Sequence, residues 1–137
     1  MGTVYEDIIL KNTIDVGEAQ RGRIPEHQVR IAAVTALVDT GAGTIVINEA
    51  ILQKLGLTIT GLRQGTLADG ASAVYQVTEP VDIHWQDREC TCRALVVPNA
   101  DSILLGVIPL EDMDLIVDPR DRKLIGAHGR DVLCLLK

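Results

Sequence analysis

The chain has 137 residues, 47% of them hydrophobic and 23% charged, and its 19 acidic against 13 basic residues give a formal net charge of −6. This length predicts a single domain over residues 1–137, and the hydrophobic content argues against disorder. A negative chain without a basic cluster is a poor partner for nucleic acid or for an anionic membrane surface, and no apolar run is long enough to span a membrane.

Short apolar runs separated by turn residues predict a β-rich fold. Phe is absent and there is one Trp, so Val, Ile and Leu must fill the core, and β-branched residues favour strands. We expect a helical segment over residues 15–22 with Asp15 as a possible N-cap. A second helix is expected over residues 48–55, between the cap Asn48 and the stop Gly56. The strands of this half are expected over residues 4–11, 29–38 and 44–47.

A hairpin signal opens the second half of the chain. Asp69-Gly70 separates two strand-like runs, residues 62–68 and 71–77, and this dipeptide favours a tight turn. Pro109 can open a short helix that reaches Met113. Further strands are expected over residues 81–86, 89–97, 103–105, 115–117, 123–125 and 132–136. The whole pattern predicts an all-β class with two or three short helices, in a closed or sandwiched sheet.

The segment that carries chemistry follows the apolar strand 29–38. It reads Asp39-Thr40-Gly41-Ala42-Gly43, so an acid stands at the end of an apolar run and is followed by a hydroxyl and small residues. A carboxylate beside a core is costly unless something stabilises it. Gly41 and Gly43 let the backbone turn sharply, and the N–H groups of such a turn can bind a carboxylate. The simpler interpretation is an ordinary turn that contains an Asp.

This segment resembles the Asp-Thr-Gly-Ala motif of aspartic proteases. A second landmark supports the resemblance: Ile103-Leu104-Leu105-Gly106 stands where the family has a hydrophobic-hydrophobic-Gly element beside the catalytic loop. Between them lie a hairpin and further strands in the expected order, and residues 108–113 fit the short helix that follows in the family. The chain is most similar to small stand-alone retropepsin-like proteins of microbial genomes. The flap lacks a multi-glycine tip, and the chain ends have no clear counterpart in the retroviral enzymes.

The resemblance implies a closed acid-protease barrel with one lobe per chain, and therefore a homodimer. Hydrolysis of a peptide bond needs two carboxylates around one water, and this chain has one Asp-Thr-Gly. The Asp15-Val16-Gly17 sequence follows polar residues and is a poor second loop. No cofactor or metal is implied, and the substrate would be an extended peptide bound as an added strand.

The same resemblance implies roles for individual residues. Asp39 would be the acid or base, with Thr40 linking the two catalytic loops across the dimer and Gly41 letting the loop fold against its mate. Ala42 would lie against substrate or partner, and Leu104, Leu105 and Gly106 would support the loop. A flap made of Asp69, Gly70 and Ala71 would close over the peptide.

The remaining reactive side chains have simpler expected roles. Three cysteines in a chain without an export signal argue against a disulfide framework and for a cytoplasmic protein. Cys90 and Cys92 lack a second ligand pair, so we expect buried thiols and no metal. Cys134 is expected in the core or at a dimer interface. His84 falls on the polar face of its strand and is expected to be solvated.

Two other functions stay open from the sequence. The chain could be a peptide-binding or dimerisation module that keeps the fold without catalysis. Asp-Thr-Gly-Ala-Gly-Thr also resembles a phosphate loop of actin-like ATPases, but those folds need two large lobes. Neither a Gly-x-Gly-x-x-Gly nor a Walker pattern is present.

Overall fold

A computed structural model describes residues 3–66 and 70–129, and in this part strands dominate. The helices are α1 (Thr13–Gln20), α2 (Glu49–Leu55), α3 (Val107–Asp112) and a single 3-10 turn, η1 (Glu26–Gln28). The strands are β1 (Tyr5–Asn12), β2 (Ile31–Val38), β3 (Ile45–Ile47), β4 (Ile59–Thr66), β5 (Ser72–Trp85), β6 (Arg88–Val96), β7 (Ile103–Leu105), β8 (Leu115–Asp118) and β9 (Lys123–Gly126).

Six of these strands close into a barrel. The hydrogen-bonded order is β1-β2-β7-β3-β6-β5, and β5 pairs back to β1, with Leu10 opposite Ile83. The closed ring leaves no free edge among these six strands, while β4 adds to the outer side of β5. The predicted fold class, mainly β with a closed barrel and short helices, is confirmed.

Aliphatic side chains fill the barrel. Each strand sends alternate residues inward, and the fully buried inward residues include Ile8, Leu10, Ile45, Ile47, Val81, Ile83, Val96 and Leu105. The core therefore consists of β-branched and Leu side chains, as the absence of Phe requires. Trp85 also packs into this cluster, and its indole N–H donates to Glu6 at 2.9 Å.

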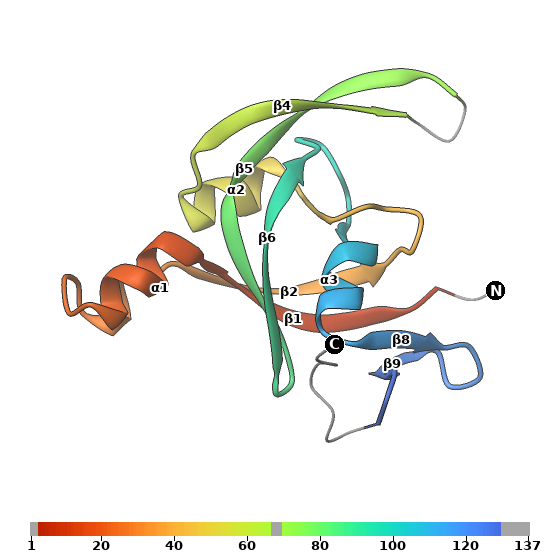
Figure 1. The fold of residues 1–137 in the computed structure, drawn as a ribbon. Coiled ribbons are helices and arrows are strands. Elements are labelled where there is room, and N and C mark those ends of the chain that lie inside the picture. Colours follow the sequence, from red (N-terminus) through yellow and green to blue (C-terminus); the bar gives the residue numbers. More distant parts are fainter. Residues whose placement is uncertain (1–2, 67–69, 130–137) are drawn as a thin grey trace.

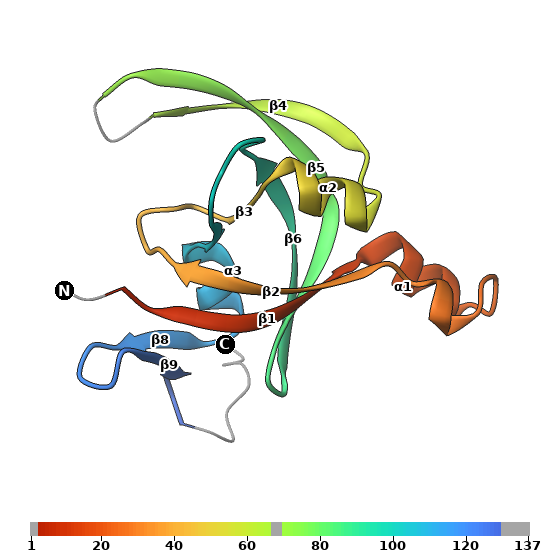
Figure 2. The same ribbon diagram turned by 180° about the vertical axis from the view of Figure 1, so that it is seen from behind.

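The hairpin of β4 and β5 extends beyond the barrel. In Figures 1 and 2 it arches over the end of the barrel where the β2–β3 loop lies, whereas α1 lies at the opposite end. β5 is one strand of 14 residues, where the sequence predicted two separate runs. A bulge between Val77 and Pro80 allows this continuity, because a proline cannot donate a ladder hydrogen bond but is tolerated at an irregularity.

The first helix begins earlier than predicted. Asn12 is its N-cap, and its side chain accepts a hydrogen bond from the Asp15 N–H at 3.1 Å. Asp15 lies inside the helix and binds the Arg30 guanidinium at 2.7 Å, so the expected capping role of Asp15 is wrong. The prediction for α2 is confirmed, with Asn48 as N-cap and Gly56 in the left-handed conformation at the C-cap.

The C-terminal part of the described chain is a small two-stranded sheet, β8 and β9, held to the barrel by Arg88. This arginine is 4% exposed and donates to the carbonyls of Met113 at 2.8 Å and Gly129 at 2.9 Å. The strand predicted over residues 132–136, and Cys134 with it, lies outside the described residues. None of the described helices is long and apolar enough to cross a membrane.

Candidate active site

The Asp39 loop, residues 39–43, connects β2 to β3, and β7 passes between these two strands. β7 runs parallel to β2, with Leu105 opposite Val38, and antiparallel to β3, with Leu104 opposite Val46. The Asp39 N–H donates to the Leu105 carbonyl at 3.0 Å, so the acid starts where the β2–β7 ladder ends. The inserted strand thus fixes the position of Asp39 relative to the barrel.

The turn that follows holds the Asp39 carboxylate. Its Oδ1 accepts a hydrogen bond from the Gly41 N–H at 2.9 Å, and the Ala42 N–H donates to the Asp39 carbonyl at 3.0 Å. A Cβ atom at Gly41 would lie 3.1 Å from that carboxylate oxygen, closer than most Cβ contacts. The turn therefore favours glycine at position 41, and the Gly41 N–H fixes the orientation of the Asp39 carboxylate at the barrel's end.

Gly106 lies directly against the Asp39 loop. A Cβ atom there would come within 2.4 Å of the Thr44 carbonyl oxygen and 2.6 Å of the Ala42 carbonyl oxygen. The first N–H groups of α3 bind the loop from the same side, Val107 to the Ala42 carbonyl at 2.9 Å and Ile108 to the Gly43 carbonyl at 3.1 Å. Residues 104–106 and the Asp39 loop, distant in sequence, are in contact.

Thr40 is exposed at the tip of this loop. Within residues 3–66 and 70–129 its hydroxyl has no hydrogen-bond partner. Ala42 is half-buried, with its carbonyl directed toward α3. The loop thus leaves a hydroxyl and a carboxylate at the surface of a single chain, on the side that the β4–β5 hairpin overhangs (Figure 1).

The predicted flap is this β4–β5 hairpin. The strands pair up to Thr66 opposite Ser72, and Gly70 adopts a positive φ of 86°, a conformation that favours glycine. Gly70 and Ala71 are both exposed. Asp69 lies outside the described residues, so its place in the flap stays a prediction.

Sequence reasoning missed two apolar residues of the hairpin, Leu62 and Val74, which are 70% and 63% exposed. Leu62 pairs with Gln76, and Gln76 pairs with the buried Val96, so these side chains share the face that continues the barrel interior. Val74, two residues before Gln76, lies on the same face. Exposed apolar side chains on that face can receive a ligand; the polar sequence around Leu62 gave little sign of them.

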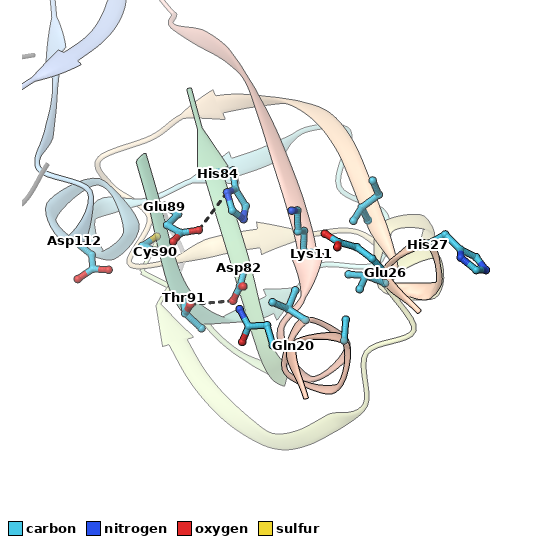
Figure 3. Close-up of a pocket in the computed structure, with 14 residues that line it drawn as sticks. Lys11, Gln20, Glu26, His27, Asp82, His84, Glu89, Cys90, Thr91 and Asp112 are labelled. Atoms are coloured by element: carbon cyan, nitrogen blue, oxygen red, sulfur yellow. Dashed lines mark hydrogen bonds and ion pairs between the residues drawn. The ribbon is translucent and has the colours of Figure 1, made fainter. Parts of the chain in front are cut away.

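A cavity lies away from the Asp39 loop. Figure 3 shows it between α1 and the outer face of β5 and β6, with a volume of about 890 Å³. His84 borders it and was expected to be solvated, but its Nε2 is buried without a hydrogen-bond partner among the described residues. Its Nδ1 faces Glu89 at 3.4 Å. No predicted catalytic or flap residue borders this cavity, so it is not the candidate site.

Comparison with known proteins identifies the family of this chain. The model of the family described as "gag-polyprotein putative aspartyl protease" matches residues 14–112, and the chain belongs to this family. The match spans the Asp39 loop, the hairpin, β7 and α3. No curated protein matches the chain. The predicted resemblance to retropepsin-like aspartic proteases is confirmed.

Solved structures of such proteases are among the similar folds. A retropepsin-like aspartic protease from Rickettsia conorii is 20% identical, with 85% of this chain and 88% of that chain covered and a TM-score of 0.49. The simian foamy virus (mac) protease is 22% identical over 57% of this chain and 80% of that chain, with a TM-score of 0.43. The EIAV protease in complex with the inhibitor HBY-793 is 30% identical over 54% of this chain and 70% of that chain, with a TM-score of 0.41.

Proposed function

We propose that this chain is an aspartic-type endopeptidase that works as a homodimer, with one Asp39 from each copy. The observation that carries the proposal is the Asp39 loop itself. A carboxylate held by the Gly41 N–H stands at the surface of one chain, beside a threonine whose hydroxyl has no partner in the described structure. Family membership supports the same reaction class.

Two carboxylates brought together by a two-fold axis would share one proton, because like charges at close range do not both ionise easily. The ionised Asp39 would act as general base on a water held between the pair. The protonated Asp39 would donate to the scissile carbonyl and stabilise the developing oxyanion. The water oxygen adds to the carbonyl carbon, and collapse of this tetrahedral intermediate breaks the C–N bond as the amine takes up a proton. The reaction needs no covalent intermediate and no metal.

The other site residues position these groups. Thr40 would donate across the dimer and hold the two loops in register, and Gly106 leaves room for the Asp39 loop to pack on α3. The peptide would lie extended between the loop and the β4–β5 hairpin, with Gly70 and Ala71 at the tip that closes over it. Leu62 and Val74 would contact its side chains.

The first test is cleavage of a mixed peptide library between about pH 4 and 7, the range in which a carboxylate pair can be half-protonated. Wild type is compared with Asp39→Asn and with Asp87→Asn, a matched change at an exposed aspartate outside the site. We expect wild type and Asp87→Asn to cleave, and Asp39→Asn to remain folded and lose at least about a thousandfold in kcat/KM. Equal cleavage by Asp39→Asn would refute the assignment.

A folded, dimeric wild type that cuts no peptide would instead favour the binding-module interpretation. Peptide binding without cleavage, measured by fluorescence anisotropy on the same library pools, would then distinguish that module from an inert protein. The cleavage and binding measurements together show whether the protein fails to bind the peptide or binds it without hydrolysing it.

A further inference from the structure

Two cysteines lie on the same side of β6, the strand that pairs with β3. Cys90 and Cys92 are two residues apart, so their side chains point to one face. Cys90 is 6% exposed and Cys92 is half-buried. Both border a cavity of about 390 Å³ whose opposite wall is formed by α3, including Ile108, which is 51% exposed. Small solutes can therefore reach this cavity from solvent.

The surroundings of the two thiols shift their pKa values in opposite directions. The hydrogen bond from the Cys90 thiol lowers the pKa of the Cys92 thiol to about 7, with smaller contributions from Thr44 and the Ile45 N–H, and together they outweigh the opposing effect of burial. The contact with Cys92, together with burial, raises the pKa of Cys90. The nearby Asp112 carboxylate acts against ionisation of both thiols. A thiolate beside a neutral thiol is the arrangement of a nucleophile with a second thiol ready to react.

Thr44 connects this pair to the Asp39 loop. It is 4% exposed, and its hydroxyl donates its one hydrogen to the Arg93 carbonyl oxygen at 2.9 Å and lies 3.6 Å from Cys92 Sγ. Its own carbonyl is the atom that a Cβ at Gly106 would approach most closely. A change at Cys92 therefore acts on a residue that is packed between β6 and the support of the loop.

We propose that Cys90 and Cys92 form a modification site that hydrogen peroxide oxidises to a disulfide, with Cys92 as the attacking sulfur. The Cys92 thiolate attacks one peroxide oxygen, the O–O bond breaks, and hydroxide leaves and takes a proton to form water. The Cys92 sulfenic acid is then attacked by the Cys90 sulfur; the S–S bond forms, the S–O bond breaks, and a second water leaves. Two electrons pass from the two sulfurs to the peroxide.

The product strains the strand. Residues two apart in an extended strand have Cα atoms about 6.4–6.8 Å apart and nearly parallel Cα–Cβ bonds. Their Cβ atoms are therefore farther apart than the roughly 3.5–4.5 Å that a disulfide requires, so β6 must bend at this point to close the bond. The bond would draw β6 together at Thr91 and withdraw the Cys92 sulfur from Thr44. We expect a reversible fall in the peptidase activity, a consequence that rests on the proposed function, whereas the oxidation itself does not.

The experiment treats the full chain with hydrogen peroxide and measures masses after blocking free thiols under denaturing conditions. Trypsin cuts after Arg88 and Arg93, so both cysteines fall in one peptide, residues 89–93. In wild type and in the control Cys134→Ser, the mass of this peptide should fall by two hydrogen atoms, and neither cysteine should carry the blocking group. Dithiothreitol should restore the two free thiols. Cys90→Ser should accumulate a sulfenic acid on Cys92, trapped by dimedone. Cys92→Ser should react roughly tenfold more slowly.

Three results would overturn the proposal. In the first, residues 89–93 stay reduced after peroxide treatment, whether or not Cys134 is oxidised. In the second, the disulfide joins two chains. In the third, Cys90→Ser and Cys92→Ser react equally fast, which would remove the assignment of Cys92 as the attacking sulfur. Peptide cleavage is measured on the same samples. A wild type that cuts no peptide before or after oxidation would count against the proposed function alone, because the mass result is independent of activity.

Discussion

Gly106→Ala tests the packing that positions the Asp39 loop. The backbone at Gly106 is ordinary extended chain, with φ −94° and ψ −172°, so any cost of alanine is steric. The added methyl group would meet three backbone atoms within 2.8 Å, the nearest at 2.4 Å. Backbone atoms cannot rotate away as a side chain can, so the loop must shift, and overpacking of this kind costs roughly 2–3 kcal/mol.

That free energy translates into a measurable change in melting temperature. For 137 residues, an unfolding entropy of about 2.1 cal/mol/K per residue gives roughly 290 cal/mol/K, so the loss corresponds to about 7–10 °C. Gly43→Ala is the matched control in the same loop, because nothing lies within 4 Å of a Cβ there. It should leave the melting temperature unchanged or raise it slightly.

The assay is thermal unfolding by circular dichroism, with peptide cleavage measured on the same samples. We expect Gly106→Ala to melt lower and to lose most of its activity even at temperatures where it is fully folded, while Gly43→Ala keeps its fold. Equal melting temperatures for the two variants would refute the steric argument, since both replace a glycine by alanine and differ only in what the methyl group meets.

Three further predictions concern Asp15, Asn12 and Cys92. Hydrogen bonds from Arg30 lower the pKa of Asp15 below its ordinary value of 3.8, so the stabilisation is full above that value and is lost as the pH falls through the folded-state pKa. Asp15→Asn should lower the free energy of unfolding at neutral pH by about 1–2 kcal/mol, and the deficit should disappear in acid; a deficit that is constant with pH would contradict this. Asn12→Ala should cost roughly 2 kcal/mol in urea unfolding, because Asn12 caps α1 and its amide also donates to the Leu55 carbonyl at 2.9 Å; a loss below about 0.5 kcal/mol would contradict it. Alkylation of Cys92 by iodoacetamide should rise about tenfold between pH 6 and 8, centred near its pKa of about 7, and a rise centred above about pH 8.5 would contradict the thiolate assignment.

The ends of α2 were predicted correctly because residues at those ends determine them. Asn48 and Gly56 bound α2 as predicted, because a cap and a left-handed glycine act within a few residues. The N-terminus of α1 was missed for the opposite reason. Asp15 looks like a cap in sequence, but its carboxylate is taken by Arg30, which the fold of β2 brings beside it. Asn12, at the end of a strand-like run, gave no comparable signal.

In the candidate site, too, contiguous features could be predicted from the sequence and contacts between distant segments could not. The Asp39 loop could be predicted because the acid, the small residues and the preceding apolar run are contiguous. The contact between Gly106 and Thr44 could be suspected only through the family resemblance, because no local pattern links β7 to that loop. The apolar face of the hairpin depends on strand register, and a bulge between Val77 and Pro80 changes which side chains face inward.

The central claim is that one active site needs an Asp39 from each of two chains, and a subunit-mixing titration tests it most directly. Wild type at fixed concentration is mixed with increasing Asp39→Asn under conditions where dimers exchange, and cleavage is measured against an equal excess of an unrelated protein. If both carboxylates are required, wild-type activity should fall to about half at equal amounts and to about a tenth at a ninefold excess, because mixed dimers hold a single carboxylate. Activity that stays constant as the variant is added, although mixed dimers are shown to form, would contradict the claim.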